Sequence, residues 1–118
     1  MNKIYLDNAA TTPLSSEVLA EMMPVLTTDF GNPNSLHSFG REAKQYVDIA
    51  RGRVANALGC EENEVYFTSG ATESNNWAIT GLAKAYRHKG NHIITSKIEH
   101  ASILETCKKL EREGYRVT

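Results

Sequence analysis

Residues 65–77, VYFTSGATESNNW, join a strand-like segment to a glycine turn and the start of a helix. Residues 65–68 are rich in side chains that favour strands, and Gly70 suits a tight turn. The first N–H groups of a helix lack partners within it and carry the positive end of its dipole. The segment therefore predicts an anion site, with phosphate as the usual anion. Because no lysine follows the turn as in a Walker loop, a nucleoside triphosphate is disfavoured.

Strands and helices alternate along the rest of the chain. Residues 92–95 and a segment beginning at Tyr115 have the composition of strands, and apolar spacing predicts helices over residues 16–26, 39–58, 72–88 and 101–112. This order predicts an α/β fold with right-handed crossover helices and a mostly parallel sheet, whose ligands bind beyond the carboxyl ends of the strands. The last strand is cut short, so we expect an incomplete sheet that belongs to a larger protein or assembly.

Local signals refine the predicted helices. Gly59 and Gly114 suit helix ends, and Ser102 with Glu105 fits a capping box at the start of the last helix. Trp77 is expected in the core. Apolar residues at helical spacing are Leu19, Met22, Met23 and Leu26 in the first helix, Val47, Ala50, Val54 and Ala57 in the buried stripe of the second, and Ile103, Leu104, Cys107 and Leu110 in the last.

Composition narrows the function classes. With 13 Lys and Arg against 14 Asp and Glu in 118 residues, the net charge of −1 argues against binding to nucleic acid or to an anionic membrane surface. No apolar run reaches the roughly 18 residues of a membrane span, and the N-terminus lacks the apolar core of a signal peptide. We therefore expect a cytoplasmic protein without disulfides. His88 and His92 flank a turn but lack partner ligands, so no metal site is predicted.

Two residues at the predicted ligand edge of the sheet could carry chemistry. The Thr72 hydroxyl, with the Ala71 and Thr72 amides, can bind phosphate, although Thr is also an ordinary helix N-cap. His100 follows the strand at residues 92–95 and could stack on a planar ring or transfer a proton. The alternative for His100 is a helix-start histidine bonded to the backbone. Spacing alone leaves these alternatives open.

Four motifs, taken together, resemble one family. The segments YLDNAATTP, FGNPNSLHSFGREA, VYFTSGATESNN and HIITSKIEHASIL, in this order and spacing, are similar to the N-terminal third of the cysteine desulfurases. These NifS-like and IscS-like enzymes use pyridoxal 5′-phosphate (PLP) and belong to the class V aminotransferase group. The resemblance covers essentially the whole chain. It implies the first portion of an aspartate-aminotransferase-like fold, with residues 1–15 bordering the active site and residues 16–118 opening the large PLP-binding domain.

The resemblance also implies roles for individual residues. Ala71 and Thr72 match the pair that holds the PLP phosphate, and His100 matches the catalytic histidine that stacks on the pyridine ring and assists proton transfer. The segments that would border the substrate pocket are Asn8, Ala9 and Ala10, and Asn32, Pro33 and Asn34. The family reaction takes sulfur from L-cysteine and yields L-alanine and an enzyme persulfide. Family members are homodimers that pass the sulfur to an iron–sulfur scaffold or another acceptor protein.

Three functional residues of the family have no match in this sequence. The Schiff-base lysine of the Ser-x-His-Lys motif, the persulfide cysteine and the aspartate facing the pyridine nitrogen lie downstream in the family, and none of them is matched here. We therefore expect the 118-residue chain alone to be inactive. The alternatives are an interaction module that completes or regulates a desulfurase in trans, a related class V enzyme such as selenocysteine lyase, and a small phosphate-binding α/β domain.

Overall fold

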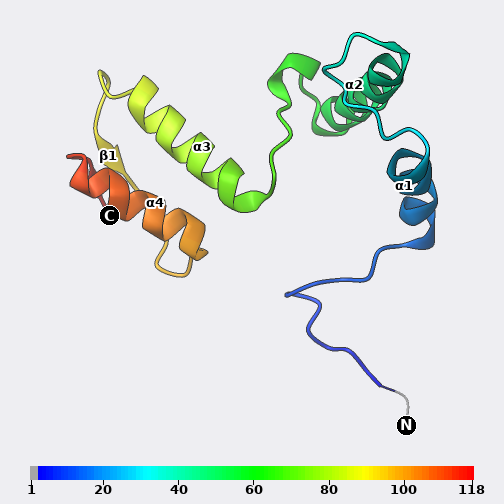
Figure 1. The fold of residues 1–118 in the computed structure, drawn as a ribbon. Helices are drawn as coiled ribbons and strands as arrows, with labels where there is room; N and C mark the ends of the chain where they lie inside the picture. The colour runs from blue at the N-terminus through cyan, green and yellow to red at the C-terminus, as the bar shows by residue number, and fades with distance from the viewer. Residues whose placement is uncertain (1–2) are drawn as a thin grey trace. The chain divides into compact units, whose positions relative to one another are not determined.

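The computed structural model describes residues 3–118, which divide after Val65 into two compact units. The first contains helices α1 (Ser16–Thr27) and α2 (Ser38–Leu58) and the short 3₁₀ helix η1 (Glu62–Glu64), and the second contains α3 (Ala71–Ala85), β1 (His92–Ile93), α4 (Ala101–Arg112) and β2 (Arg116–Val117) (Figure 1). None of the helices within residues 3–118 combines the length and hydrophobicity needed to cross a bilayer.

Helix α2 of the first unit is fixed at both ends. Its N-cap is His37, whose Nδ1 accepts a hydrogen bond of 3.4 Å from the backbone N–H of Gly40. A Cβ at Gly40 would lie 2.1 Å from the carbonyl oxygen of Ser35, so only glycine allows this close approach. The helix ends at Gly59, whose left-handed φ of 69° confirms the helix end predicted there. Arg51 donates a hydrogen bond to the carbonyl of Val65 and ties the end of the unit to the helix.

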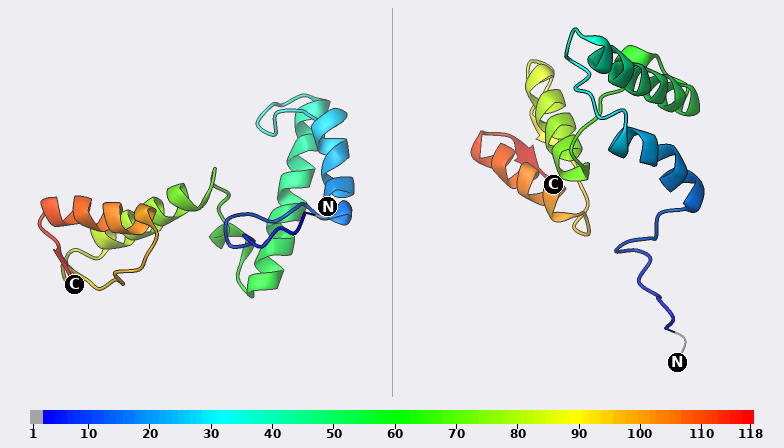
Figure 2. Two further views of the ribbon diagram at one scale, coloured as in Figure 1. Left: turned by 90° about the horizontal axis from the view of Figure 1, so that it is seen from below. Right: turned by 45° about the vertical axis from the view of Figure 1, so that its right-hand side comes forward.

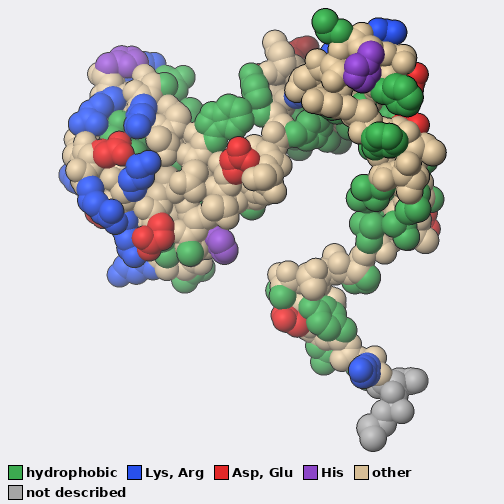
Figure 3. Space-filling model, in the orientation of Figure 1, with side chains coloured by type: hydrophobic (Ala, Val, Ile, Leu, Met, Phe, Trp, Pro, Cys, Tyr) green, Lys and Arg blue, Asp and Glu red, His purple; other side chains and the backbone are tan. Residues whose placement is uncertain are grey.

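The apolar faces of α1 and α2 are exposed, which makes the prediction of a buried stripe in the second helix wrong. Val54 is 37% exposed, and the residues of α2 that are buried are Gly40, Ala43 and Ala55. The stripe instead lines part of a groove of about 700 Å³, to which α1 contributes Val18, Met22 and Leu26. Hydrophobic side chains are visible on the surface over α1 (Figure 3). The spacing identified an apolar face, but no element of this unit within the described residues covers it.

The second unit has a small core between two helices. Helices α3 and α4 lie side by side in both sets of views (Figures 1 and 2). Leu110 is fully buried, Cys107 is 4% exposed, and the Tyr115 hydroxyl donates a 3.0 Å hydrogen bond to the carbonyl of Ala83. The predicted apolar side of α4 is therefore confirmed. Burial is the main reason that the pKa of the Cys107 thiol is raised, so this thiol is protonated and structural.

The sheet is a short parallel pair. His92 of β1 is in register with Arg116 of β2, and Ile93 with Val117. The pairing continues through a 2.9 Å hydrogen bond from the N–H of Thr95 to the carbonyl of Thr118. The parallel crossover through α4 is confirmed, but the strand predicted over residues 65–68 is wrong. Val65 is extended, with φ of −98° and ψ of 122°, yet no neighbouring strand pairs with this segment within residues 3–118.

Candidate functional site

The turn before α3 leaves the N-terminus of the helix open. Its N-cap is Gly70, which supplies no side-chain hydrogen bond, and the carbonyl of Gly70 accepts from the N–H of Ser74 at 3.2 Å. A Cβ placed at Gly70 would meet no atom within 4 Å beyond its chain neighbours, so the turn is open on that side. The Ala71 and Thr72 side chains are exposed. Uncapped amides, a hydroxyl and open space together fit a phosphate group, and hence the phosphate of PLP.

Side chains on both sides of the turn hold its shape. One carboxylate oxygen of Glu73 accepts hydrogen bonds from the Ser69 N–H at 2.7 Å and from the Ser69 hydroxyl at 2.8 Å. These bonds, the backbone one foremost, lower the pKa of Glu73, so its carboxylate is ionised at neutral pH. Thr68 adds a 2.7 Å hydroxyl contact with Ser74 across the turn. Glu73 therefore orders the turn through Ser69 without capping the Ala71 and Thr72 amides.

His100 lies at the start of α4 and is its N-cap. Its Nδ1 accepts a 3.1 Å hydrogen bond from the Ser102 N–H and lies 2.9 Å from the Ser102 hydroxyl oxygen. The backbone-bonded alternative for this histidine is thus observed. It does not use the whole ring, because the side chain is exposed and its Nε2 has no partner among the described residues. One edge of the imidazole is held by the helix, and the other is available to a ligand.

Two side-chain hydrogen bonds join α3, whose first turn contains Thr72, to α4, which His100 caps. Asn75 Nδ2 donates to the Ser102 hydroxyl oxygen at 2.9 Å, next to His100. Asn76 Nδ2 donates to the carbonyl of Thr72 at 2.9 Å. The Oδ1 of Asn76 accepts a 2.8 Å bond from the Thr106 hydroxyl of α4. The predicted phosphate turn and the predicted ring-stacking histidine therefore lie at the linked N-terminal ends of two packed helices.

Several residues of this arrangement were missed or misassigned from the sequence. The capping box predicted for Ser102 and Glu105 is wrong, because His100 caps the helix, Ser102 is buried, and Glu105 pairs with Lys108. Asn75 is separated from Ser102 by 27 positions, and no local pattern signals that contact. Glu73 is the third residue of α3, a position at which an acidic side chain often bonds back to the residues before the helix, so its contact with Ser69 could have been predicted.

Trp77, which was predicted to be part of the core, is instead 55% exposed. It makes an edge-on contact with Tyr66, with ring centroids 5.3 Å apart. The prediction is wrong because the side of α3 that carries Trp77 has no covering layer within the described residues. The aromatic pair therefore stands on the surface of the second unit, a few positions from the turn at Gly70.

The residues predicted to border a substrate pocket belong to the first unit. Asn8, Ala9 and Ala10 form an exposed turn, in which the N–H of Ala10 donates to the carbonyl of Asp7 at 3.1 Å. In the second segment, Oδ1 of Asn32 accepts a 2.9 Å bond from the N–H of Asn34. Pro33 is exposed between them. Asn32 also lines a hollow of about 370 Å³ beside Phe30 and His37. Their role as a substrate border stays a prediction.

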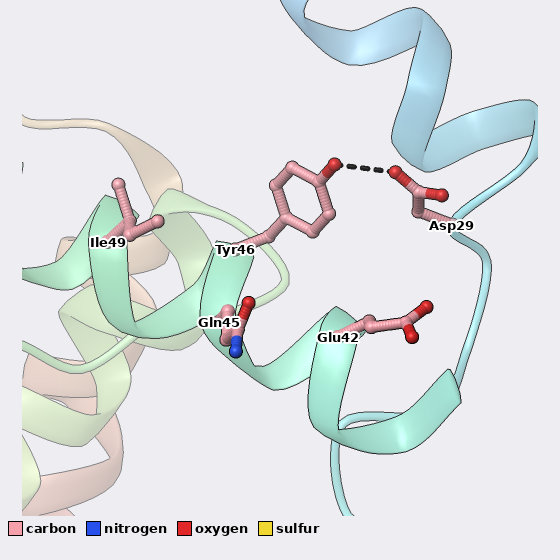
Figure 4. Close-up of a pocket in the computed structure, with 5 residues that line it drawn as sticks. All are labelled: Asp29, Glu42, Gln45, Tyr46 and Ile49. Carbon is pink, nitrogen blue, oxygen red and sulfur yellow. Dashed lines mark hydrogen bonds between the residues drawn. The ribbon is translucent and has the colours of Figure 1, made fainter. Parts of the chain in front are cut away.

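Another hollow, of about 290 Å³ and lined mostly by polar residues, lies beside α2 (Figure 4). There the Tyr46 hydroxyl donates a 2.5 Å hydrogen bond to the Asp29 carboxylate. This bond raises the pKa of Tyr46, because removing the proton would place a phenolate against the carboxylate. Tyr46 is therefore a structural donor and unsuited to act as a base. Over residues 3–118, no cluster of His, Cys, Asp or Glu could hold a metal ion.

Comparisons with known proteins identify relatives over almost the full chain. The family model for class-V aminotransferases matches residues 4–118. The cysteine desulfurase IscS of Methanosarcina thermophila is 55% identical over 115 residues, which cover 98% of this chain and 28% of that protein. A solved NifS-like protein superposes with a TM-score of 0.86 at 42% identity, covering 94% of this chain and 30% of the other. A structure of SspA in complex with cysteine gives 0.83 at 43% identity, covering 93% and 32%.

Proposed function

The chain belongs to the class-V aminotransferase family, and we propose that it forms the phosphate-binding part of a PLP-dependent cysteine desulfurase. The observation that carries the proposal is the open N-terminus of α3 linked by hydrogen bonds to the histidine that caps α4. The cysteine desulfurase name of the Methanosarcina relative and the cysteine in the SspA structure support this substrate class. The chain spans about 30% of the length of these relatives, so the activity of a whole enzyme is part of the proposal.

The chain would bind PLP through its phosphate and its ring. The Ala71 and Thr72 amides and the Thr72 hydroxyl would hold the phosphate, and His100 would lie against the pyridine ring. When bound, PLP supplies an electron sink for the bonds broken at the substrate amino acid. The residues of this chain contribute binding, orientation and a proton-carrying imidazole. Glu73 and Ser69 would keep the turn in shape before the cofactor arrives.

The proposed reaction takes sulfur from L-cysteine, gives L-alanine and leaves a persulfide on an enzyme cysteine, from which an iron–sulfur scaffold or another acceptor protein receives it. Asn8–Ala10 and Asn32–Asn34 would border the substrate. A homodimer is proposed for the whole enzyme, and the exposed apolar groove of the first unit supports burial against further protein. The free Cys60 and Cys107 suit the reducing cytoplasm, where we place the enzyme.

A chimera tests this function directly. In it, the matched first 28% of the Methanosarcina thermophila IscS is replaced by this chain, and the rest of that relative supplies the groups that the family uses downstream. We expect the chimera to release sulfide from L-cysteine in the presence of PLP. The reason is that this chain is 55% identical to the segment of the relative that it replaces. The measurement is the rate of sulfide release with dithiothreitol as acceptor.

Two controls set the lower and upper limits of the rate of sulfide release. The 118-residue chain alone is expected to release no sulfide above the rate of free PLP, since no lysine here stands in the family's Ser-x-His-Lys motif. The unmodified relative sets the upper limit. A chimera that folds and binds PLP but does not turn over L-cysteine would contradict the proposed activity, and turnover by the isolated chain would contradict the proposed division of roles.

A further inference from the structure

A chain of hydrogen bonds runs from α3 to the inner nitrogen of the His100 ring. Asn75 Nδ2 lies 2.9 Å from Ser102 Oγ, and Ser102 Oγ lies 2.9 Å from His100 Nδ1. The Ser102 backbone N–H also points at Nδ1, at 3.1 Å. Ser102 is only 8% exposed, so water competes little for its hydroxyl. These contacts are independent of any ligand and are present in the chain alone.

The direction of each bond in this chain can be assigned from the donors. The Asn75 amide nitrogen and the Ser102 backbone N–H can only donate. A hydroxyl that accepts from Asn75 has its own single proton left to donate, and His100 Nδ1 is the acceptor within reach. A proton on Nδ1 would face the proton of the Ser102 N–H. Nδ1 therefore carries the lone pair, and in the neutral ring Nε2 carries the proton.

We propose that Asn75 and Ser102 are positioning residues that hold the His100 ring and set its neutral tautomer, with the proton on Nε2. The outer edge of the imidazole, which has no partner among the described residues, then offers a hydrogen-bond donor. The meaning of this arrangement for catalysis rests on the proposed function, in which that edge would serve the cofactor and substrate. The tautomer itself is a property of the chain without any cofactor.

Reversing the polarity of the relay tests the proposal. An ionised carboxylate can only accept, so in Asn75→Asp the Ser102 hydroxyl must donate to it, and His100 Nδ1 keeps only the Ser102 backbone N–H as a donor. The probe is the chain labelled with ¹⁵N in its imidazole rings, without cofactor and at alkaline pH, where imidazole is neutral. In the wild type we expect Nδ1 to resonate as a lone-pair nitrogen. In Asn75→Asp we expect Nδ1 to remain a lone-pair nitrogen and to shift in the direction of one that accepts one hydrogen bond fewer.

A matched control separates the relay from a general effect of charge. Asn76→Asp adds the same charge to the same helix, but Asn76 bonds Thr72 and Thr106 rather than the Ser102 side chain. We expect the Nδ1 resonance in Asn76→Asp to stay at the wild-type position. A shift of the same size in both variants, or a shift in neither, would overturn the proposal.

A further variant covers the case in which Asn75→Asp fails to fold. Ser102→Ala removes the hydroxyl and keeps the backbone N–H, so Nδ1 loses one of its two donors. We expect the Nδ1 resonance to move away from its wild-type position, in the direction expected when a lone-pair nitrogen accepts fewer hydrogen bonds. An unchanged resonance would contradict the relay. Because neither experiment uses PLP or measures turnover, the relay and the proposed enzyme function can fail separately.

Discussion

Replacing His100 with alanine in the chimera is expected to lower kcat for sulfide release by about a hundredfold to ten-thousandfold, the range for loss of a group that transfers a proton in the transition state. The exposed Nε2 edge of this ring is the part of the side chain that the helix does not use. KM for L-cysteine is expected to change far less than kcat. The measurement is steady-state sulfide release over a range of L-cysteine concentrations.

The structural role of His100 requires its own control, because the side chain caps α4. Loss of an N-cap costs about 1 kcal/mol of stability. Asparagine is a good N-cap that can accept from the Ser102 N–H, but it has no imidazole. We expect His100→Asn to recover most of the thermal stability lost in His100→Ala and none of the lost kcat. Wild-type kcat in His100→Asn would mean that His100 serves only as a helix cap.

The second large effect is expected in the core of the second unit. Leu110 is fully buried beside Cys107 and Tyr115, so Leu110→Ala removes well-packed methyl groups and leaves a cavity. The expected loss in the free energy of unfolding is about 2–5 kcal/mol, a large share of the stability of a small domain. The measurement is urea unfolding of the 118-residue chain, followed by circular dichroism.

Two control variants show whether the stability lost in Leu110→Ala comes from a cavity in the core. Leu82 is 61% exposed in the same unit, and Leu82→Ala is expected to change stability by less than about 0.5 kcal/mol. Leu110→Met keeps the volume and is expected to cost less than about 1.5 kcal/mol. Equal losses for Leu110→Ala and Leu82→Ala would show that the space between α3 and α4 is not the core of this unit.

The helix bounds were largely predictable because local signals decide them. The helix expected over residues 101–112 is α4, Ala101–Arg112, and the end expected at Gly59 is the left-handed cap of α2. Spacing of apolar residues and the backbone freedom of glycine are both local properties. The parallel crossover was also predictable from the order of elements, and the class-V aminotransferase match confirms the family read from the motifs.

Burial and pairing were less predictable because they depend on distant partners. Residues 65–68 have strand-forming side chains, but a strand exists only where a neighbour completes its hydrogen bonds, and no neighbour lies there within the described residues. Val54 and Trp77 have the hydrophobic character of core residues, yet both are exposed because no described element covers them. The pattern identified which faces are apolar, and the fold determines which of them are buried.

The candidate site also combines residues that local sequence signals with contacts that it does not. Thr72 and His100 were predicted from the turn chemistry and the motifs around them, and their role in a site stays a prediction. The link between the two helices could not, because it consists of the Asn75–Ser102 and Asn76–Thr106 hydrogen bonds, which join residues 27 and 30 positions apart in sequence. The cap of α4 was also misassigned, since Ser102 and Glu105 fit the capping pattern while a histidine nitrogen took the acceptor role.

Binding of the PLP phosphate by Thr72 and the start of α3 is the proposed interaction on which the site depends. Its most direct test compares the affinity of the chimera and of its Thr72→Val variant for PLP and for pyridoxal, which has the same ring without the phosphate. Because a hydrogen bond to a charged group contributes about 1.5–3 kcal/mol, Thr72→Val is expected to weaken PLP binding by about tenfold to a hundredfold and to leave pyridoxal binding unchanged. Equal weakening for both ligands, or no weakening of PLP binding, would contradict the claim.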